Sequence, residues 1–321
     1  MGWIEVSLLV RWLLGWPLGL RMPALPAAAT GAGPPRQRPS LLIPARNEAA
    51  TLPHLLVALA RQSLPPLEVI VIDDHSEDRT ATIAVETEPD FLASLVVAHR
   101  RWGGLISVQP YHRTERPYEL LSLLFNLVGL MAVPLGPGCG VAFGPAMITS
   151  RTDYLRSGGH AAVADKVVED WFLAHAYEAA GLPVSAWIGH GQIAYRMYPG
   201  GLADMVSGFD KNFATAAGEV RWPWMLAVLL WLSGLFWAAW CLPAALLGLP
   251  LVGDPGLLPN LLLYAAFALQ LLVITRPVGR FGWISLVFPV PVLFFLGVFL
   301  LAILNLERGQ VVWKGRRVAT R

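Results

Sequence analysis

Residues Ser40–Glu48 have the sequence SLLIPARNE, and residues Leu67–Asp74 have the sequence LEVIVIDD. Each segment holds a short apolar run that stops at a proline or at acidic residues, which is typical of strands buried in a parallel sheet. The stretch between them suits a helix that ends near Gln62, with Asn47 or Thr51 as its N-cap. The order strand, helix, strand predicts the start of a doubly wound α/β sheet, in which ligands bind at the carboxyl ends of the strands.

The chain carries far fewer charges than a soluble domain. It is 55% hydrophobic and 14% charged, with a mean hydropathy of +0.53, whereas soluble domains are about 25% charged. Three ranges have no acidic or basic side chain: Pro223–Val252, Pro255–Thr275 and Phe281–Leu306. Each is long enough to cross a bilayer as a helix, which takes roughly 20 apolar residues. The sequence therefore predicts an integral membrane protein.

The charge balance and the cysteines exclude other classes. A net charge of +2 and an isoelectric point of about 8.6 are too near balance for nucleic acid to be an expected partner. Cys139 and Cys241 lie in very different contexts, so no disulfide is expected between them. Neither belongs to a spacing typical of metal ligands.

Residues 1–21 are predicted to form a membrane anchor, followed by a Pro-, Ala- and Gly-rich linker over residues 22–39. The alternative is a cleaved signal peptide, because Ala27–Ala29 offers small residues at a plausible cleavage site. Arg11 interrupts the apolar stretch, and the tryptophans around it suit anchoring at the membrane interface.

Residues 40–218 are predicted to form a water-facing domain, residues 222–306 transmembrane helices and residues 307–321 a basic cytoplasmic tail. Three crossings after a cytoplasmic domain would leave that tail outside, against the positive-inside rule. One apolar run is therefore expected not to cross fully. Phe281–Val292, which contains two prolines, is the candidate for an interfacial or re-entrant segment.

The two opening segments resemble glycosyltransferase family 2. In that family, a Pro-x-x-Asn-Glu at the first strand end and an Asp-Asp-x-Ser at the second line the nucleotide pocket. The resemblance implies a donor site formed by Pro44, Arg46, Asn47, Glu48, Asp73, Asp74 and Ser76. Carboxylates at a strand end can accept hydrogen bonds from a uracil N–H or from ribose hydroxyls. The alternative is that the aspartate pair only caps a turn.

The block Gly104–Glu119 resembles the carotenoid-acid glycosyltransferases within this family. His112, Arg113 and Arg116 place two fixed cations and a titratable ring close together in the sequence. Such a cluster can bind a diphosphate or the carboxylate of an acceptor. The alternative is a solvated basic loop.

The segment Lys166–Ala174 resembles the Glu-Asp motif of the family, which here is Glu169 and Asp170. The resemblance implies that Asp170 is the general base of an inverting transfer, because a hydroxyl acceptor must lose its proton. A carboxylic acid acceptor is already ionised at neutral pH, so Asp170 would then mainly orient it. The alternative is a helix N-terminus, where the helix dipole favours acidic residues.

Two further segments, Tyr195–Pro199 and Gly208–Phe213, resemble the same subgroup and precede the first long apolar run. Lys211 can hold the acceptor or the pyrophosphate, or pair with a lipid phosphate. The polymer-forming branch of the family carries Gln-x-x-Arg-Trp at this point. Its absence here argues against a polysaccharide synthase.

The acidic metal motif of the family is missing. No Asp-x-Asp occurs in the sequence, although this motif holds Mg²⁺ or Mn²⁺ against the sugar diphosphate. The sequence passes from Ala81–Ala84 directly to Val85–Leu92, a phrase that in the family normally follows the Asp-x-Asp closely. The resemblance therefore implies the deletion of a strand–helix–strand portion of roughly 30 residues or more. Glu86 and Glu88 are a poor substitute, because they lie downstream of where the acids belong. No metal ligand is assigned from the sequence.

These features predict an α/β protein with an incomplete doubly wound sheet of the GT-A type and membrane helices at both ends. The resemblance implies an inverting transfer of a hexose, glucose from UDP-glucose, to a lipophilic acceptor such as a carotenoid carboxylic acid. The expected location is the inner cell membrane, with several crossings and a cytoplasmic catalytic domain that UDP-sugars can reach. The alternative is a catalytically impaired remnant that serves as a membrane-bound binding or scaffold protein.

Overall fold

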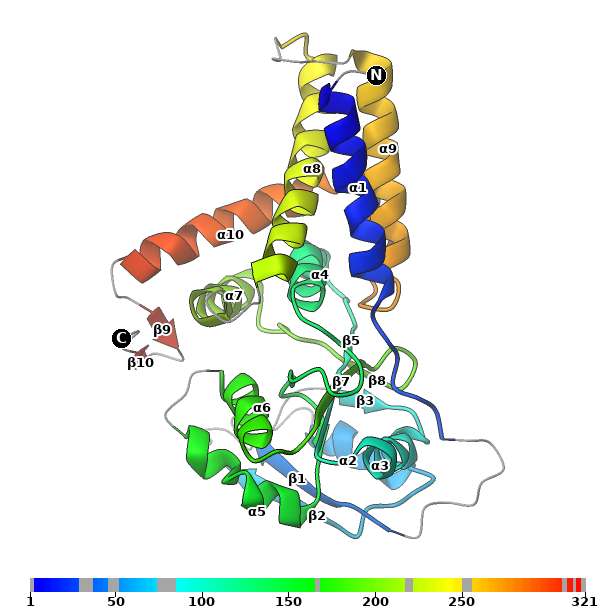
Figure 1. Cartoon of the computed structure of the whole chain (residues 1–321), viewed down its shortest axis with the longest axis vertical. Helices are drawn as coiled ribbons and strands as arrows, with labels where there is room; N and C mark the ends of the chain where they lie inside the picture. Colours follow the sequence, from blue (N-terminus) through cyan, green and yellow to red (C-terminus); the bar gives the residue numbers. More distant parts are fainter. Residues whose placement is uncertain are drawn as a thin grey trace. The chain divides into compact units, whose positions relative to one another are not determined.

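The computed structural model describes residues 3–28, 37–45, 52–73, 85–164, 168–216, 222–249, 256–307, 311–313 and 316–318 (Figure 1). The chain divides into two compact units. The membrane unit consists of Met1–Met22, Thr114–Val133 and Tyr198–Arg321, and the α/β unit consists of Pro23–Arg113 and Pro134–Met197.

The α/β unit contains the predicted strand, helix and strand. They are β1 (Ser40–Ala45), α2 (Leu52–Ala60) and β2 (Glu68–Asp73), and the two strands pair in parallel. The register sets Ala45 beside Asp73, so both strands end at the same edge. The predicted opening of the fold is confirmed, while the candidate N-caps Asn47 and Thr51 lie outside the described residues.

The other strands of this unit form two three-stranded sheets among the described residues. In one sheet β4 lies between β6 and β7, antiparallel to β6 and parallel to β7; in the other, β8 lies between β3 and β5. The strands are β3 (Val85–Thr87), β4 (Leu105–Gln109), β5 (Tyr111–His112), β6 (Met147–Ile148), β7 (Val184–Ile188) and β8 (Ile193–Tyr195). The helices are α3 (Phe91–Trp102), α5 (Arg151–Arg156), η2 (Gly159–Val163) and α6 (Glu169–Ala179).

The core of the α/β unit forms around β4 and β7. Every residue of β7 is buried, as expected of a strand covered on both faces. Phe91 and Leu95 of α3 share one hydrophobic cluster with Ile106 of β4. Tyr177 of α6 shares a second cluster with Leu105, on the same strand. The alternation of side chains along β4 thus joins two helices to one sheet.

The segment predicted as a linker is partly built into this unit. Leu25 is buried, and its N–H donates to the carbonyl of Ile188 at 3.0 Å, while the N–H of Ile188 donates to the carbonyl of Pro23 at 2.9 Å. Residues 23–28 therefore belong to the α/β unit, which corrects the predicted boundary at residue 40. The predicted end at residue 218 also moves to Met197, because the helix that follows packs in the membrane unit.

Three helices of the membrane unit are long and apolar enough to cross a bilayer, counted among the described residues: α1 (Trp3–Leu20), α8 (Trp222–Leu246) and α9 (Leu257–Ile274). They run side by side (Figure 1). Gln270 joins all three, since it accepts a hydrogen bond from Trp231 Nε1 at 2.8 Å and donates one to the Trp12 carbonyl at 2.7 Å. A side chain at Gly15 would overlap the Trp231 indole. This close packing favours a permanent anchor over a cleaved signal peptide.

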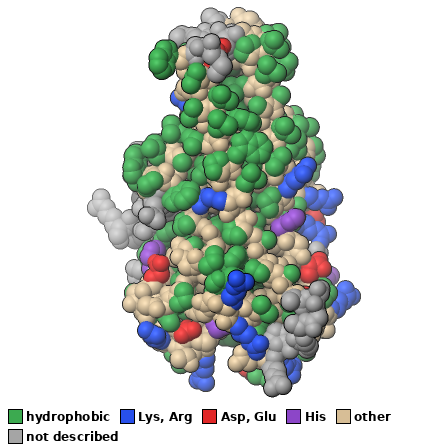
Figure 2. All heavy atoms as spheres, turned by 45° about the vertical axis from the view of Figure 1, so that its right-hand side comes forward, with side chains coloured by type: hydrophobic (Ala, Val, Ile, Leu, Met, Phe, Trp, Pro, Cys, Tyr) green, Lys and Arg blue, Asp and Glu red, His purple; other side chains and the backbone are tan. Residues whose placement is uncertain are grey.

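Hydrophobic side chains gather on the visible face of these three helices in Figure 2. Leu229 and Trp240 of α8 and Leu262 of α9 are among the exposed large hydrophobic residues. An apolar surface of this kind is unfavourable in water and suits contact with lipid. The chain is a membrane protein.

The last apolar run does not extend the bundle as another parallel helix. It forms η3 (Gly282–Val287) and α10 (Pro289–Glu307), and α10 runs across the direction of α8 in Figure 1. α10 packs against η1 (Pro117–Ser122), α4 (Leu123–Met131) and α7 (Leu202–Ala216). The predicted interfacial segment Phe281–Val292 is therefore part of a longer stretch that continues to Glu307. Beyond it, β9 (Val311–Trp313) and β10 (Arg316–Val318) pair in antiparallel fashion.

Candidate active site

The predicted donor site lies at the shared edge of β1 and β2. Pro44 pairs with Ile72 and Ala45 with Asp73, so the backbones of Pro44 and Asp73 reach the carboxyl ends of neighbouring parallel strands. The other predicted donor residues, Arg46, Asn47, Glu48, Asp74 and Ser76, lie outside the described residues, as do the side chains of Pro44 and Asp73. The edge is as predicted, and the role of each side chain stays a prediction.

Asp170 is held at the start of α6 by two backbone N–H groups. Gly144 N–H donates to Asp170 Oδ2 at 2.7 Å, and Trp171 N–H donates to Asp170 Oδ1 at 2.9 Å. Burial raises the pKa of the Asp170 carboxyl above its ordinary value and the negative charge of Glu169 adds to the rise, although the two N–H groups act against it. A fixed carboxylate with a raised pKa is suited to accepting or sharing a proton. Glu169 itself is exposed.

A glycine-rich loop over residues 134–146 supplies the partner of Asp170. Ser107 of β4 accepts a hydrogen bond from Phe143 N–H at 2.6 Å and donates one to the Phe143 carbonyl at 2.9 Å. Ser185 of β7 accepts one from Gly138 N–H at 3.1 Å. Both serines are buried, so the rigid sheet fixes the loop and thereby the N–H of Gly144.

Sequence reasoning missed this loop. Its signal is the alternation of glycines at positions 136, 138 and 140, followed by Gly144. These first three glycines have positive φ angles, of 109°, 63° and 72°, a conformation that other residues rarely adopt. A Cβ at Gly144 would lie 3.4 Å from Asp170 Oδ2, so a larger side chain there would crowd the carboxylate.

His112 lies in a buried polar cluster with Gln109 and Tyr195. Gln109 Nε2 donates to the Tyr195 hydroxyl at 2.9 Å and lies 3.3 Å from His112 Nε2, and the rings of His112 and Tyr195 are 4.8 Å apart. Burial lowers the pKa of His112 to about 3. The ring is therefore neutral at pH 7. It can exchange hydrogen bonds but adds no positive charge to the predicted anion site, where a titratable ring was expected.

The two arginines beside His112 belong to different units. Arg113 is in the α/β unit, where its N–H donates to the Tyr195 carbonyl at 2.9 Å. Arg116 is an exposed residue of the membrane unit and precedes η1, with its N–H donating to Glu119 Oε2 at 3.2 Å. The side chain of Lys211 lies outside the described residues, although its backbone is part of α7. A joint role of these cations stays a prediction.

No group of three or more His, Cys, Asp or Glu side chains that could hold a metal ion occurs within the described ranges. The side chains of Asp73, Asp74 and Glu86 fall outside them. Mg²⁺ or Mn²⁺ therefore finds no fitting ligand set in the described part of the chain.

Comparison with known proteins agrees with the strand-edge architecture. The family model "Glycosyl transferase family 2" matches residues 40–108, from β1 into β4. The 4,4'-diaponeurosporenoate glycosyltransferases of Staphylococcus aureus strains USA300, NCTC 8325 / PS 47 and MRSA252 are each 30% identical to the chain over 335 aligned residues. Each alignment covers 87% of this chain and 87% of the relative. The chain belongs to glycosyltransferase family 2.

Membership of family 2 gives the α/β unit a GT-A fold. The match to the family model covers the strand ends of the donor edge and stops before His112 and Asp170. Those two positions rest on the geometry described above. The chain is thus a glycosyltransferase by family, with a sugar donor and an acceptor as its expected substrates.

Proposed function

We propose that the chain transfers glucose from UDP-glucose to a carotenoid carboxylic acid, with inversion at the anomeric carbon. Asp170 carries this proposal, because its carboxylate is fixed at the start of α6 and has a raised pKa. The acceptor class is supported by the relatives, whose name specifies 4,4'-diaponeurosporenoate. The apolar surface of the membrane unit supports access from the bilayer.

In this reaction a carboxylate oxygen of the acceptor attacks the anomeric carbon of glucose. The bond from that carbon to the diphosphate oxygen breaks, and UDP leaves with the electron pair. The products are a glucosyl ester and UDP. At neutral pH the acceptor has no proton to lose, so Asp170 acts as an orienting group. Because two nearby carboxylates repel each other, a carboxyl with a raised pKa can share one proton with the acceptor during binding.

The donor is proposed to bind at the carboxyl edge of β1 and β2. The parallel ends of these strands, next to Pro44 and Asp73, support a nucleotide site there. Arg113, Arg116 and Lys211 are proposed to contact the diphosphate or the acceptor, since guanidinium and ammonium groups bind such anions. A divalent cation of the Mg²⁺ or Mn²⁺ kind, if bound, would neutralise charge on the leaving diphosphate.

The membrane orientation is proposed from the helix arrangement. If α1, α8 and α9 cross and α10 does not, the N-terminus is outside, and the α/β unit and the tail share the cytoplasmic side. The basic residues Arg276 and Arg280, after α9, then also lie inside. This arrangement removes the topological conflict that three crossings after the α/β unit would create.

A second candidate function is that of a membrane-bound remnant with binding but no turnover. The absence of Asp-x-Asp from the sequence favours it. The alignment with the relatives is also longer than the chain, 335 positions against 321 residues, so it includes gaps in this chain. Such gaps are consistent with a deleted unit.

The test is UDP-glucose turnover by detergent-purified protein with a carotenoid acid, in Mg²⁺ or Mn²⁺ and in EDTA. Glucosyl ester formed only with metal would mean that the chain has a replacement metal site. Ester formed equally in EDTA would mean that fixed cations replace the metal. Retained UDP binding without ester would support the remnant, and absence of UDP binding would refute the proposed donor site.

A further inference from the structure

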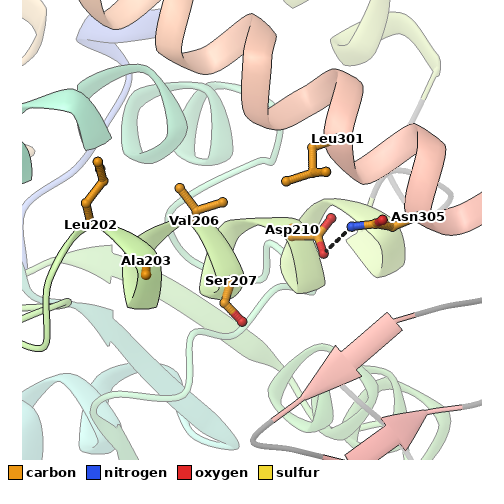
Figure 3. A pocket seen from close by; sticks show the side chains of 7 residues that line it. All are labelled: Leu202, Ala203, Val206, Ser207, Asp210, Leu301 and Asn305. Atoms are coloured by element: carbon orange, nitrogen blue, oxygen red, sulfur yellow. Dashed lines mark hydrogen bonds between the residues drawn. The ribbon is translucent and has the colours of Figure 1, made fainter.

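Two helices of the membrane unit, α7 and α10, line a groove of about 700 Å³ (Figure 3). Leu202, Ala203, Val206, Ser207 and Asp210 come from α7, and Leu301 and Asn305 come from α10. Most of the lining is apolar, and Asp210 faces Asn305 at one end, whereas Ser207 lies midway along α7 and points away from Leu301 (Figure 3). Nothing in the proposed transfer reaction uses this groove.

Asp210 has one oxygen paired and one oxygen unpaired. Asn305 Nδ2 donates to Asp210 Oδ2 at 3.0 Å. Asp210 Oδ1 is buried and has no hydrogen-bond partner among the described residues. Leaving a buried acceptor unsatisfied is unfavourable, so a rotation of the Asp210 carboxyl that presents this oxygen to a ligand donor in the groove gains a hydrogen bond that the empty groove lacks. The ligand is therefore expected to carry O–H or N–H groups.

The rest of the groove suits a hydrocarbon chain. Leu202 is 45% exposed and Leu301 is 40% exposed, and Val206 lies between Leu202 and Asp210 on α7. Leu300 and Leu304 add to the exposed apolar surface of α10. A lipid chain that covered these side chains would remove them from water. The groove thus combines an apolar channel with one acceptor for a donor-bearing head.

We infer that this groove binds the sugar head of a glycosylated lipid, with a sugar hydroxyl donating to Asp210 and the chain lying along Leu202 and Leu301. Asp210 also discriminates between the two lipids of the proposed reaction. It accepts hydrogen bonds from the hydroxyls of the glucosyl product, whereas its carboxylate repels the carboxylate of the free acid. The groove is therefore a product site that favours departure of the glycosylated lipid from the site of transfer. The identity of the lipid as the reaction product rests on the proposed function.

The experiment uses the full chain in phosphatidylcholine nanodiscs, whose head groups carry no hydroxyl. Two photoreactive probes are compared, an octadecyl β-glucoside and octadecanoic acid, each with a diazirine in its chain. Trypsin cuts after Arg196 and Lys211, so one peptide reports labelling of the groove-facing part of α7. We expect the glucoside to label this peptide about tenfold more than the acid, the effect of one hydrogen bond to a charged group.

Three variants separate the contributions of the Asp210 hydrogen bond, the Asp210 charge and the space in the groove to probe labelling. Asp210→Leu is expected to reduce glucoside labelling to the level of the acid. Asp210→Asn keeps an acceptor oxygen without the charge, so it should retain the glucoside and raise labelling by the acid. Ala203→Trp fills the groove without touching Asp210 and should reduce labelling by both probes. Asp204→Asn, an exposed carboxylate on the same helix, is the matched control and should change neither.

Equal labelling of the unmodified chain by both probes would overturn the inference, as would full glucoside labelling of Ala203→Trp. Because Asp210→Asn and Ala203→Trp keep or leave untouched the Asn305 contact, they remain informative even if Asp210→Leu does not fold. The labelling contains no UDP-glucose, so it does not depend on turnover. A chain that binds the glucoside yet transfers no sugar would uphold the groove and refute the proposed reaction.

Discussion

At the residue scale, Asp170 and His112 show how burial shifts the pKa of two titratable groups in opposite directions while favouring the uncharged form of both. Burial raises the pKa of Asp170, which favours its protonated form, and lowers that of His112, which favours its neutral form. Asp170 receives two backbone hydrogen bonds, from Gly144 and Trp171, which fix the orientation of its carboxylate. His112 is enclosed with Gln109 and Tyr195 and supports the end of β4.

Asp170→Asn should lower kcat by about 100-fold, because an acceptor carboxylate that is no longer held in the reactive geometry attacks far more slowly. The amide can accept only one of the two N–H bonds, so the side chain loses both its charge and part of its orientation. The KM for UDP-glucose should stay within about twofold, because the proposed donor edge is formed by β1 and β2, whereas Asp170 belongs to α6. Steady-state kinetics check this, with Asp90→Asn, an exposed carboxylate of the α/β unit, as the control. An unchanged kcat would show that Asp170 takes no part in the reaction.

His112→Gln should make stability less dependent on pH. The folded pKa of His112 is about 3, below the ordinary 6.5, so the unfolded chain binds the extra proton. Stability from the neutral ring is fully present above pH 6.5 and is lost as the pH falls toward 3. Between pH 7.5 and 5 the wild type should lose about 2 kcal/mol from this group.

Thermal unfolding at pH 7.5 and pH 5 measures this difference. The Tm of the wild type should fall further than the Tm of His112→Gln over the same interval. His54, which is exposed, provides the control substitution His54→Gln. Parallel pH profiles for the wild type and His112→Gln would contradict a buried neutral ring.

At the element scale, the glycine-rich loop is fixed by hydrogen bonds to β4 and β7. Ser107 and Ser185 are buried on these strands and bond the loop backbone, and Gly144 then presents its N–H to Asp170. The loop therefore transmits the rigidity of the sheet to a carboxylate that belongs to another element. This arrangement is a support for the candidate site rather than part of its chemistry.

Ser107→Ala should destabilise the chain by about 1 kcal/mol, since it leaves the half-buried N–H and carbonyl of Phe143 without their Ser107 partner. It should also lower kcat several-fold, because Gly144 follows Phe143 in the loop. Unfolding and initial-rate measurements test both effects. Ser122→Ala, a buried serine on η1 in the membrane unit, is the matched control and should affect stability without changing kcat. A normal kcat in Ser107→Ala would show that the loop does not support Asp170 in the reaction.

At the scale of the whole molecule, the chain combines a GT-A unit with a membrane unit made from both ends of the sequence. Gln270 bonds to Trp12 and Trp231, which lie on the N-terminal helix and on α8. The N-terminal anchor is thus an integral part of the membrane unit. The number of crossings after the α/β unit decides whether the tail lies on the same side of the membrane as that unit.

A reporter fused after Arg321 should behave as a cytoplasmic protein. Green fluorescent protein at this position should fluoresce, and alkaline phosphatase should be inactive, because in the proposed orientation α10 does not return the chain across the bilayer. Alkaline phosphatase inserted between Leu249 and Gly256, where α8 and α9 are joined, should be active and is the internal control. Active phosphatase at the C-terminus would show that α10 crosses.

Much of the fold follows from local pattern. The β1 and β2 strands, the helix between them and the apolar membrane runs were all predictable, because a strand or a membrane span is encoded by consecutive residues. The resemblance also pointed to Pro44 and Asp73, which lie at one strand edge, and to Asp170; the roles of these residues stay predictions. By contrast, the place of residues 23–28 in the α/β unit was not predictable, since composition gave no sign that Leu25 pairs with Ile188, far along the chain.

By itself the sequence determined the fold class, the membrane character, the strand edge and the candidate acidic residue. Only the tertiary structure decided that Gly144 bonds Asp170, that His112 is neutral, that Arg113 and Arg116 belong to separate units and that Asp210 meets Asn305. The physical reason is the distance along the sequence over which each effect acts. Hydrophobicity and propensity act over neighbouring residues, whereas burial, pKa and hydrogen-bond partners depend on segments that come together only when the chain folds.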